Sequence, residues 1–141
     1  MNIIDTILMV DDDEATNFLH EIIITDANCC NNLIIIDDAE KALEMLKNDL
    51  QPNLLFLDIN MPKMNGWEFL DLFKQTKKGN DLHLKIIIFS TSLNPRDKEK
   101  AQEYKNVSFM SKPLTGDLVK EIVDEYFLQK KVFKKTGLHE N

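Results

Sequence analysis

The chain has 141 residues, of which 43% are hydrophobic, so it can bury one core but has no room for a second folded domain. Its 17 Lys and Arg residues against 24 Asp and Glu give a net charge of -7, which argues against nucleic acid as a direct partner. The two cysteines, Cys29 and Cys30, are adjacent and do not suit disulfide geometry, so we expect reduced thiols. No apolar stretch approaches the roughly 20 residues of a membrane span, and no signal peptide is apparent. We therefore expect a soluble, cytoplasmic protein.

Five apolar runs of strand length recur along the chain, at residues 7–10, 33–36, 54–57, 86–89 and 107–110. Segments with helical spacing of apolar residues lie between them and after the last one. Repeated strand–helix units predict a parallel sheet with right-handed crossovers and helices on both faces. The predicted fold class is α/β, a doubly wound five-stranded parallel sheet of the flavodoxin-like (βα)5 type with strand order 2-1-3-4-5.

The predicted helices differ in character. In the first, Ala15, Phe18, Leu19, Ile22 and Ile23 share one face, which we expect to face the core. The fourth, residues 96–105, offers only two apolar side chains, so we predict a weakly packed, mobile helix that starts at Asn94-Pro95. The fifth carries a wide apolar stripe over residues 118–127.

Charged residues follow three of the predicted strands: Asp11 and Asp12 follow the first, Asp58 the third and Lys112 the fifth. Because strands one and three are neighbours in the predicted order, the three carboxylates should meet at one edge of the sheet. Like charges so close together need a positive partner. A hard divalent cation such as Mg²⁺, with phosphate oxygens, fits such a pocket, and Lys112 could add an ammonium group to it. A hydroxyl from Ser90 or Thr91 could donate a further hydrogen bond.

The order and spacing of these residues resemble those of a receiver domain of two-component response regulators. The resemblance covers residues 7–127 and rests on five matches. They are the pair Asp11-Asp12, then Asp58, then Met61-Pro62 with Gly66, then Ser90-Thr91, and finally Lys112-Pro113. The chain departs from the common pattern in small ways, with Asn60 where many relatives have Met and Asn65 where Asp is frequent. The length suggests a stand-alone receiver, similar to the chemotaxis receivers, and the alternative is a piece of a larger regulator.

The resemblance implies a role for each of these residues. Asp58 would be the phosphoacceptor, and Mg²⁺ would be bound by Asp12, Asp58 and the backbone carbonyl of Asn60, with Asp11 acting through a water. Lys112 would pair with the phosphoryl group, and its peptide bond to Pro113 is expected to be cis. Ser90, with Thr91 as its alternate, would be the switch hydroxyl, and Phe109 the aromatic residue that follows activation.

The predicted function is that of a phosphoacceptor signalling protein in a two-component phosphorelay, and not of an enzyme. The phosphoryl group would come from a sensor histidine kinase or a histidine phosphotransfer protein. A downstream protein target would bind the face formed by residues 96–105, 107–110 and 118–127. We assign residues 1–128 to the receiver domain and 129–141 to a basic C-terminal tail.

Two alternatives differ in the residue that takes phosphate. A receiver-like scaffold would take none. A Mg²⁺-dependent phosphatase of the haloacid-dehalogenase type would use Asp11 as nucleophile and Asp13 as acid, but this gives Asp58 no role. Outside that alternative, we interpret Asp13 and Glu14 as solvated residues that favour the start of a helix. His20, His83 and His139 are interpreted as structural or exposed.

Overall fold

A computed structural model of the chain describes the backbone of residues 2–81, 83–91 and 94–135, and their side chains as far as Lys130. The elements, in chain order, are β1 (Ile4–Val10), α1 (Glu14–Ala27), β2 (Cys30–Ile36), α2 (Ala39–Lys47), β3 (Leu54–Leu57), α3 (Gly66–Lys74), the 3-10 turn η1 (Lys78–Asn80), β4 (Lys85–Ser90), α4 (Pro95–Ala101), β5 (Val107–Ser111) and α5 (Gly116–Lys135).

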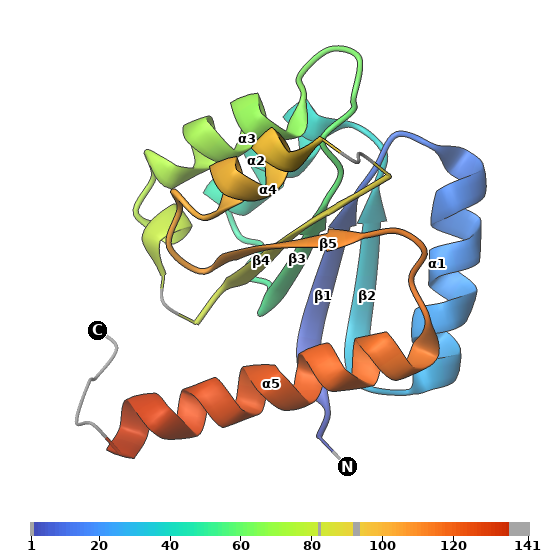
Figure 1. Cartoon of the computed structure of the whole chain (residues 1–141), viewed down its shortest axis with the longest axis vertical. Helices are drawn as coiled ribbons and strands as arrows, with labels where there is room; N and C mark the ends of the chain where they lie inside the picture. The colour runs from blue at the N-terminus through green and yellow to red at the C-terminus, as the bar shows by residue number, and fades with distance from the viewer. Residues whose placement is uncertain (1, 82, 92–93, 136–141) are drawn as a thin grey trace.

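The five strands form one parallel sheet in the order β2-β1-β3-β4-β5, which confirms the predicted fold. Helices α1 and α5 cover one face, and α2, α3 and α4 cover the other (Figure 1). The chain order of strands reverses between β1 and β3, so the loops that follow these two strands flank the same crevice.

The continuous apolar runs arise because both faces of the sheet are covered. In β3, Leu55 and Leu57 pack into the cluster under α2, α3 and α4, whereas Leu54 and Phe56 pack into the cluster under α1 and α5. Alternate side chains of one strand thus fill two cores. This arrangement fixes the end of β3, and therefore Asp58, between two packed layers.

The predicted core face of α1 is wrong except at Ile23, which is half-buried and packs against the core under α1 and α5. Phe18 is 68% exposed, Leu19 51% and Ile22 45%, whereas the buried side chains of the helix are those of His20, Ile24 and Ala27. The rotation of α1 is fixed at its first turns, where Asp13 caps the helix and the Asn17 side chain donates a hydrogen bond to the carbonyl of Asp11 at 2.7 Å. These polar contacts turn a different face toward the sheet, and Phe18, Leu19 and Ile22 face solvent.

The fourth helix is shorter than predicted, because α4 ends at Ala101. Its predicted start is confirmed, since Asn94 caps the helix and Pro95 is its first residue. Trp67 joins α3 to this region: its indole N–H donates to Asp97, and its ring stacks on that of Tyr104 with centroids 6.2 Å apart. The mobility of α4 stays a prediction.

The last helix reaches Lys135, beyond the proposed domain boundary at residue 128. Residues 136–141, and with them the end of the predicted tail, lie outside the described residues. Within the described part of the chain, no helix combines the length and apolar character that crossing a membrane requires.

Candidate functional site

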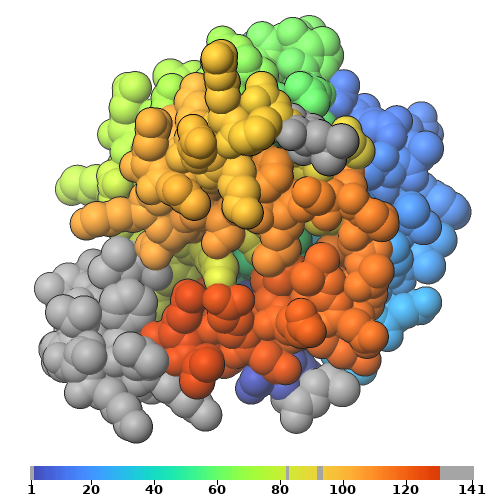
Figure 2. All heavy atoms as spheres, viewed as in Figure 1, coloured from blue at the N-terminus to red at the C-terminus, as the bar shows by residue number. Residues whose placement is uncertain are grey.

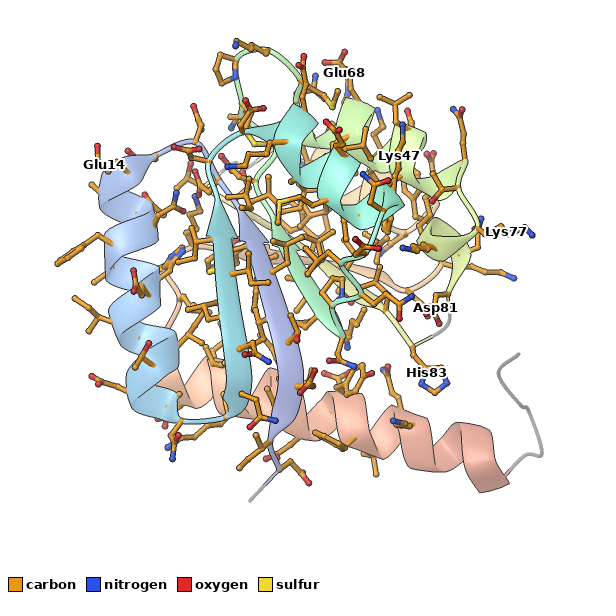
Figure 3. All side chains as sticks on the ribbon, turned by 180° about the vertical axis from the view of Figure 1, so that it is seen from behind. Glu14, Lys47, Glu68, Lys77, Asp81 and His83 are labelled. Carbon is orange, nitrogen blue, oxygen red and sulfur yellow. The ribbon has the colours of Figure 1, made fainter. Side chains whose placement is uncertain are left out.

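The carboxylates that the sequence singled out lie together at the carboxyl ends of β1 and β3. Val10 and Leu57 are paired in the register of the two strands, so Asp11 and Asp58 follow directly side by side. The Asp58 backbone N–H donates to the Val10 carbonyl at 3.0 Å, which continues the ladder as far as the site. Glu14 and Glu68, in the first turns of α1 and α3, mark this end of the sheet in Figure 3, whereas Asp81 and His83 mark the opposite end.

Lys112 brings a positive charge to this cluster from the end of β5. Its Nζ lies 2.8 Å from Asp11 Oδ2 and 3.8 Å from Asp58 Oδ1. Its backbone N–H donates to the carbonyl of Ser90 at 2.9 Å, and the Lys112–Pro113 peptide bond is cis. The ammonium group therefore bridges the two buried carboxylates.

One carboxylate oxygen from each of Asp11, Asp12 and Asp58 lies within 4.8 Å of the others. Asp11 and Asp58 are only 4% and 8% exposed, whereas Asp12 is open to solvent. Three ionised carboxylates and one ammonium leave a charge of about -2, carried by hard oxygen donors. The residues present thus fit a divalent cation such as Mg²⁺.

The environment of Asp58 disfavours its charged form. Burial is the main cause, and the neighbouring Asp11 charge adds to it, so the pKa of Asp58 is raised from 3.8 to about 6. The Lys112 ammonium and the backbone N–H groups of Asn60 and Ile59 oppose this rise in pKa. A group with such a perturbed pKa in a cleft is a candidate reactive group.

Replacing Lys112 by methionine is expected to raise the pKa of Asp58 further above about 6, because the change removes the ammonium group that stabilises the carboxylate. The measurement is an NMR titration of the aspartate carboxyl carbons in metal-free protein. Lys47→Met, which changes an exposed lysine at the end of α2, is the matched control. An Asp58 pKa that stays constant or falls in Lys112→Met would contradict the electrostatic role of this lysine.

Gly66 holds the loop after β3 against the site. Its N–H donates to the Ile59 carbonyl at 2.8 Å, and a Cβ on this residue would lie 2.5 Å from the Asp58 carbonyl oxygen. Only glycine allows this close approach. Asn65, directly before it, caps α3 in a capping box with Glu68.

The remaining candidate residues surround the cluster. Ser90 is fully buried at the end of β4, and Thr91 after it is exposed. Phe109, on the edge strand β5, is half-buried and packs against the cluster under α2, α3 and α4. Asn60 is exposed on the loop after β3.

Sequence reasoning did not foresee two polar residues beside the site, Asn17 and His20, although it interpreted His20 as structural or exposed. Asn17 binds the backbone of Asp11, as described above. His20 packs on Phe89 with ring centroids 5.4 Å apart, and it lines a small cavity together with Asp11 and Asp58. The available signal was their spacing of three, which places both on one helix face, but the apolar stripe next to them favoured another orientation.

The sequence profile of the family described as "Response regulator receiver domain" matches residues 7–124. The chain belongs to this family. The site just described therefore occupies the acidic pocket of a receiver domain, and its Asp cluster is typical of a receiver Mg²⁺ site. Receiver domains are generally signalling modules and not enzymes.

Individual relatives agree with this assignment. The response regulator Rcp1 of Synechocystis is 33% identical over 98 residues, which are 64% of this chain and 65% of that protein. The crystal structure of a two-component response regulator from Cytophaga hutchinsonii shares 32% identity, with a TM-score of 0.81 over 89% of this receiver and 98% of that chain. The chemotaxis protein CheY4 of Vibrio cholerae, at 19% identity and a TM-score of 0.74, covers 87% of this receiver and 98% of that chain, and shows the likeness of fold alone.

Proposed function

We propose that this receiver takes a phosphoryl group on Asp58 from a phosphohistidine and uses the modified state to control binding of a partner protein. The observation that carries the proposal is the position of Asp58, recessed next to Asp11 and Lys112 at the carboxyl end of β3. The donor is a sensor histidine kinase or a histidine phosphotransfer protein. The receiver acts in the cytoplasm.

In the proposed transfer, an Asp58 carboxylate oxygen attacks phosphorus in line as the bond from phosphorus to the donor imidazole breaks. The imidazole nitrogen then takes a proton from solvent. Lys112 leaves its contacts with the carboxylates to pair with the phosphoryl oxygens, and the site contributes mainly positioning and charge neutralisation. Later attack by water on the aspartyl phosphate returns Asp58 to its carboxylate form.

Asp12, Asp58 and the backbone carbonyl of Asn60 would bind Mg²⁺, with Asp11 acting through a water. The bound ion would offset the charge on the phosphoryl oxygens. Its ligands come from the loops after β1 and β3, which the sheet already holds side by side.

The proposed switch runs from the site toward the β5 edge of the sheet. Ser90 would bond the phosphoryl group, with Thr91 as the alternate hydroxyl, and Phe109 would follow its movement. A shift from 1:99 to 99:1 needs about 5.5 kcal/mol, and charge-assisted hydrogen bonds contribute roughly 1.5 to 3 kcal/mol each. Figure 2 shows α4, β5 and α5 side by side on one surface, which we propose as the face for a downstream target.

The phosphatase alternative receives less support. Asp13, which would be its general acid, instead accepts hydrogen bonds from the backbone and the side chain of Thr16 as the cap of α1. These bonds hold the pKa of the Asp13 carboxyl below its usual range, which suits a cap and not a proton donor. The scaffold alternative differs from the proposal only in that Asp58 would take no phosphoryl group.

The test is the intact mass after incubation with Mg²⁺ and acetyl phosphate, for wild type and Asp58→Asn. We expect one phosphoryl adduct on the wild type, dependent on Mg²⁺ and absent from the variant. Asp49→Asn, at an exposed aspartate beyond the end of α2, is the control and should still form the adduct. An adduct that persists in Asp58→Asn refutes the site, and no adduct with acetyl phosphate or phosphohistidine donors supports the scaffold.

A further inference from the structure

Beside the carboxylate site lies a second hollow, a pocket of about 230 Å³ between the loops that follow β1, β2 and β3. Asp12 lines it and is also one of the three clustered carboxylates, so the pocket and the site adjoin. Its volume is below the roughly 300 to 1,000 Å³ of most small-molecule sites. The size suits a single long side chain.

The lining of the pocket combines apolar and acidic groups. Met61 and Met64 contribute flexible apolar walls, and Asp37 and Asp38 join Asp12 at its edge. Methionine adapts to the shape of what it contacts, and the stems of Lys and Arg pack well on apolar surface while their charged ends reach acidic groups. The pocket thus matches the two parts of a basic side chain.

The pocket acids are available to an outside cation. Asp38 caps α2, but both of its capping bonds, from the N–H groups of Glu40 and Lys41, go to Oδ1, so the cap does not use Oδ2. Asp37 is exposed, and no ion pair joins it to Lys63, the lysine in the lining, within the part of the chain that the structure describes. The first 40 residues, which supply Asp12, Asp37 and Asp38, include ten Asp and Glu but no Lys or Arg, so the basic residue of the pocket lining is Lys63.

We infer that this pocket receives an arginine or lysine side chain of the protein that donates the phosphoryl group. The inference rests on the proposed function, because Asp58 is only 8% exposed and a donor histidine that reaches it must bring the donor surface onto the surrounding loops. The pocket opens among those loops, so the donor covers it. A basic side chain of the donor then offsets the charge of Asp37 and Asp38. The pocket thereby selects among protein donors, whereas small phosphodonors such as acetyl phosphate are not affected by it.

The test compares two phosphodonors. Phosphorylated histidine kinases and phosphotransfer proteins of the source organism are each mixed with the wild-type receiver. The protein that transfers its phosphoryl group fastest is taken as the donor. Transfer rates from this donor and from acetyl phosphate, at low receiver concentration, are measured for wild type, Asp37→Lys, Asp37→Asn and Asp49→Lys. Asp49→Lys carries the same change of charge beyond the far end of α2.

We expect the ratio of the donor rate to the acetyl phosphate rate to fall at least tenfold in Asp37→Lys and less in Asp37→Asn, with little change in Asp49→Lys. A donor in which the responsible basic residue is changed to Glu should restore transfer to Asp37→Lys. A ratio within twofold of wild type in Asp37→Lys, or an equal fall in Asp49→Lys, overturns the inference. Failure of every protein donor while acetyl phosphate still works also overturns it, whereas failure of acetyl phosphate together with every protein donor refutes the proposed function itself.

Discussion

Replacing Asp58 by asparagine is expected to raise the free energy of unfolding of the metal-free protein by about 2 kcal/mol near neutral pH. Burial and the Asp11 charge raise the pKa of Asp58 to about 6, so the ionised carboxylate lowers the free energy of unfolding. Each pKa unit corresponds to about 1.4 kcal/mol, so the pKa change, which already includes the opposing effect of Lys112, sets an upper limit of about 3 kcal/mol, and solvent screening reduces the gain. Asparagine has a similar shape and no charge.

The sign of the pH dependence follows from the direction of this pKa change. Because the pKa is higher in the folded than in the unfolded protein, Asp58 contributes stability at low pH that is lost as pH rises from 3.8 through about 6. The difference between Asp58→Asn and wild type should therefore be small near pH 4 and level off above about pH 7. Urea unfolding between pH 4 and pH 7, without Mg²⁺, measures the difference in free energy of unfolding. At neutral pH the melting temperature of the variant should be higher by about 5 °C.

Asp49→Asn is the control for the loss of one acidic charge, and it should change stability little because the side chain is exposed. Equal stability of Asp58→Asn and wild type across the pH range would contradict the raised pKa. A lower stability of the variant above pH 7 would mean that the contact with Lys112 outweighs burial.

Replacing Gly66 by alanine is expected to lower the free energy of unfolding by about 3 kcal/mol and to slow phosphorylation more than tenfold. The added Cβ would lie 2.5 Å from the Asp58 carbonyl oxygen and 2.9 Å from the Ile59 Cα. Both are backbone atoms, so no side chain can move aside and the loop after β3 has to shift. Since this loop carries Asn60 and follows Asp58 directly, the shift displaces the site. Urea unfolding and the rate of adduct formation with acetyl phosphate measure the two effects.

Gly116 offers a matched control at the start of α5, because a Cβ there meets no atom within 4 Å. Gly116→Ala should leave both the free energy of unfolding and the phosphorylation rate within a narrow margin of wild type. If Gly66→Ala behaves like Gly116→Ala, the close approach at Asp58 does not limit the loop.

The sheet could be predicted because its signals are local. Each strand is a short apolar run buried on both faces, and the alternation with helices leaves few topologies for five parallel strands. The bounds of β3, residues 54–57, agree with the predicted run, whereas β1 and β2 each begin three residues before the runs. Those additional residues include polar side chains such as Asp5 and Asn31, which an apolar pattern does not include.

The site could be predicted in composition but not in detail. The positions of Asp11, Asp58 and Lys112 follow from the strand order, because parallel strands end at one edge of the sheet. The rotation of α1 could not be predicted, because the hydrogen bond from Asn17 to the Asp11 backbone competes with hydrophobic periodicity. The pocket beside Asp37 also lacked a sequence signal, since three separate loops enclose it.

In α1, the apolar side chains exposed to solvent lie on one face of the helix, and the side chains that pack on the sheet lie on another. Phe18, Leu19 and Ile22 contribute little to the core, while His20 and Ile24 on another face hold the helix to the sheet. Substitutions along the stripe are therefore free of packing constraints, and related proteins with the same fold can vary this surface without losing stability. Specificity can evolve there while the carboxylate site, which depends on the carboxyl ends of β1 and β3, stays constant.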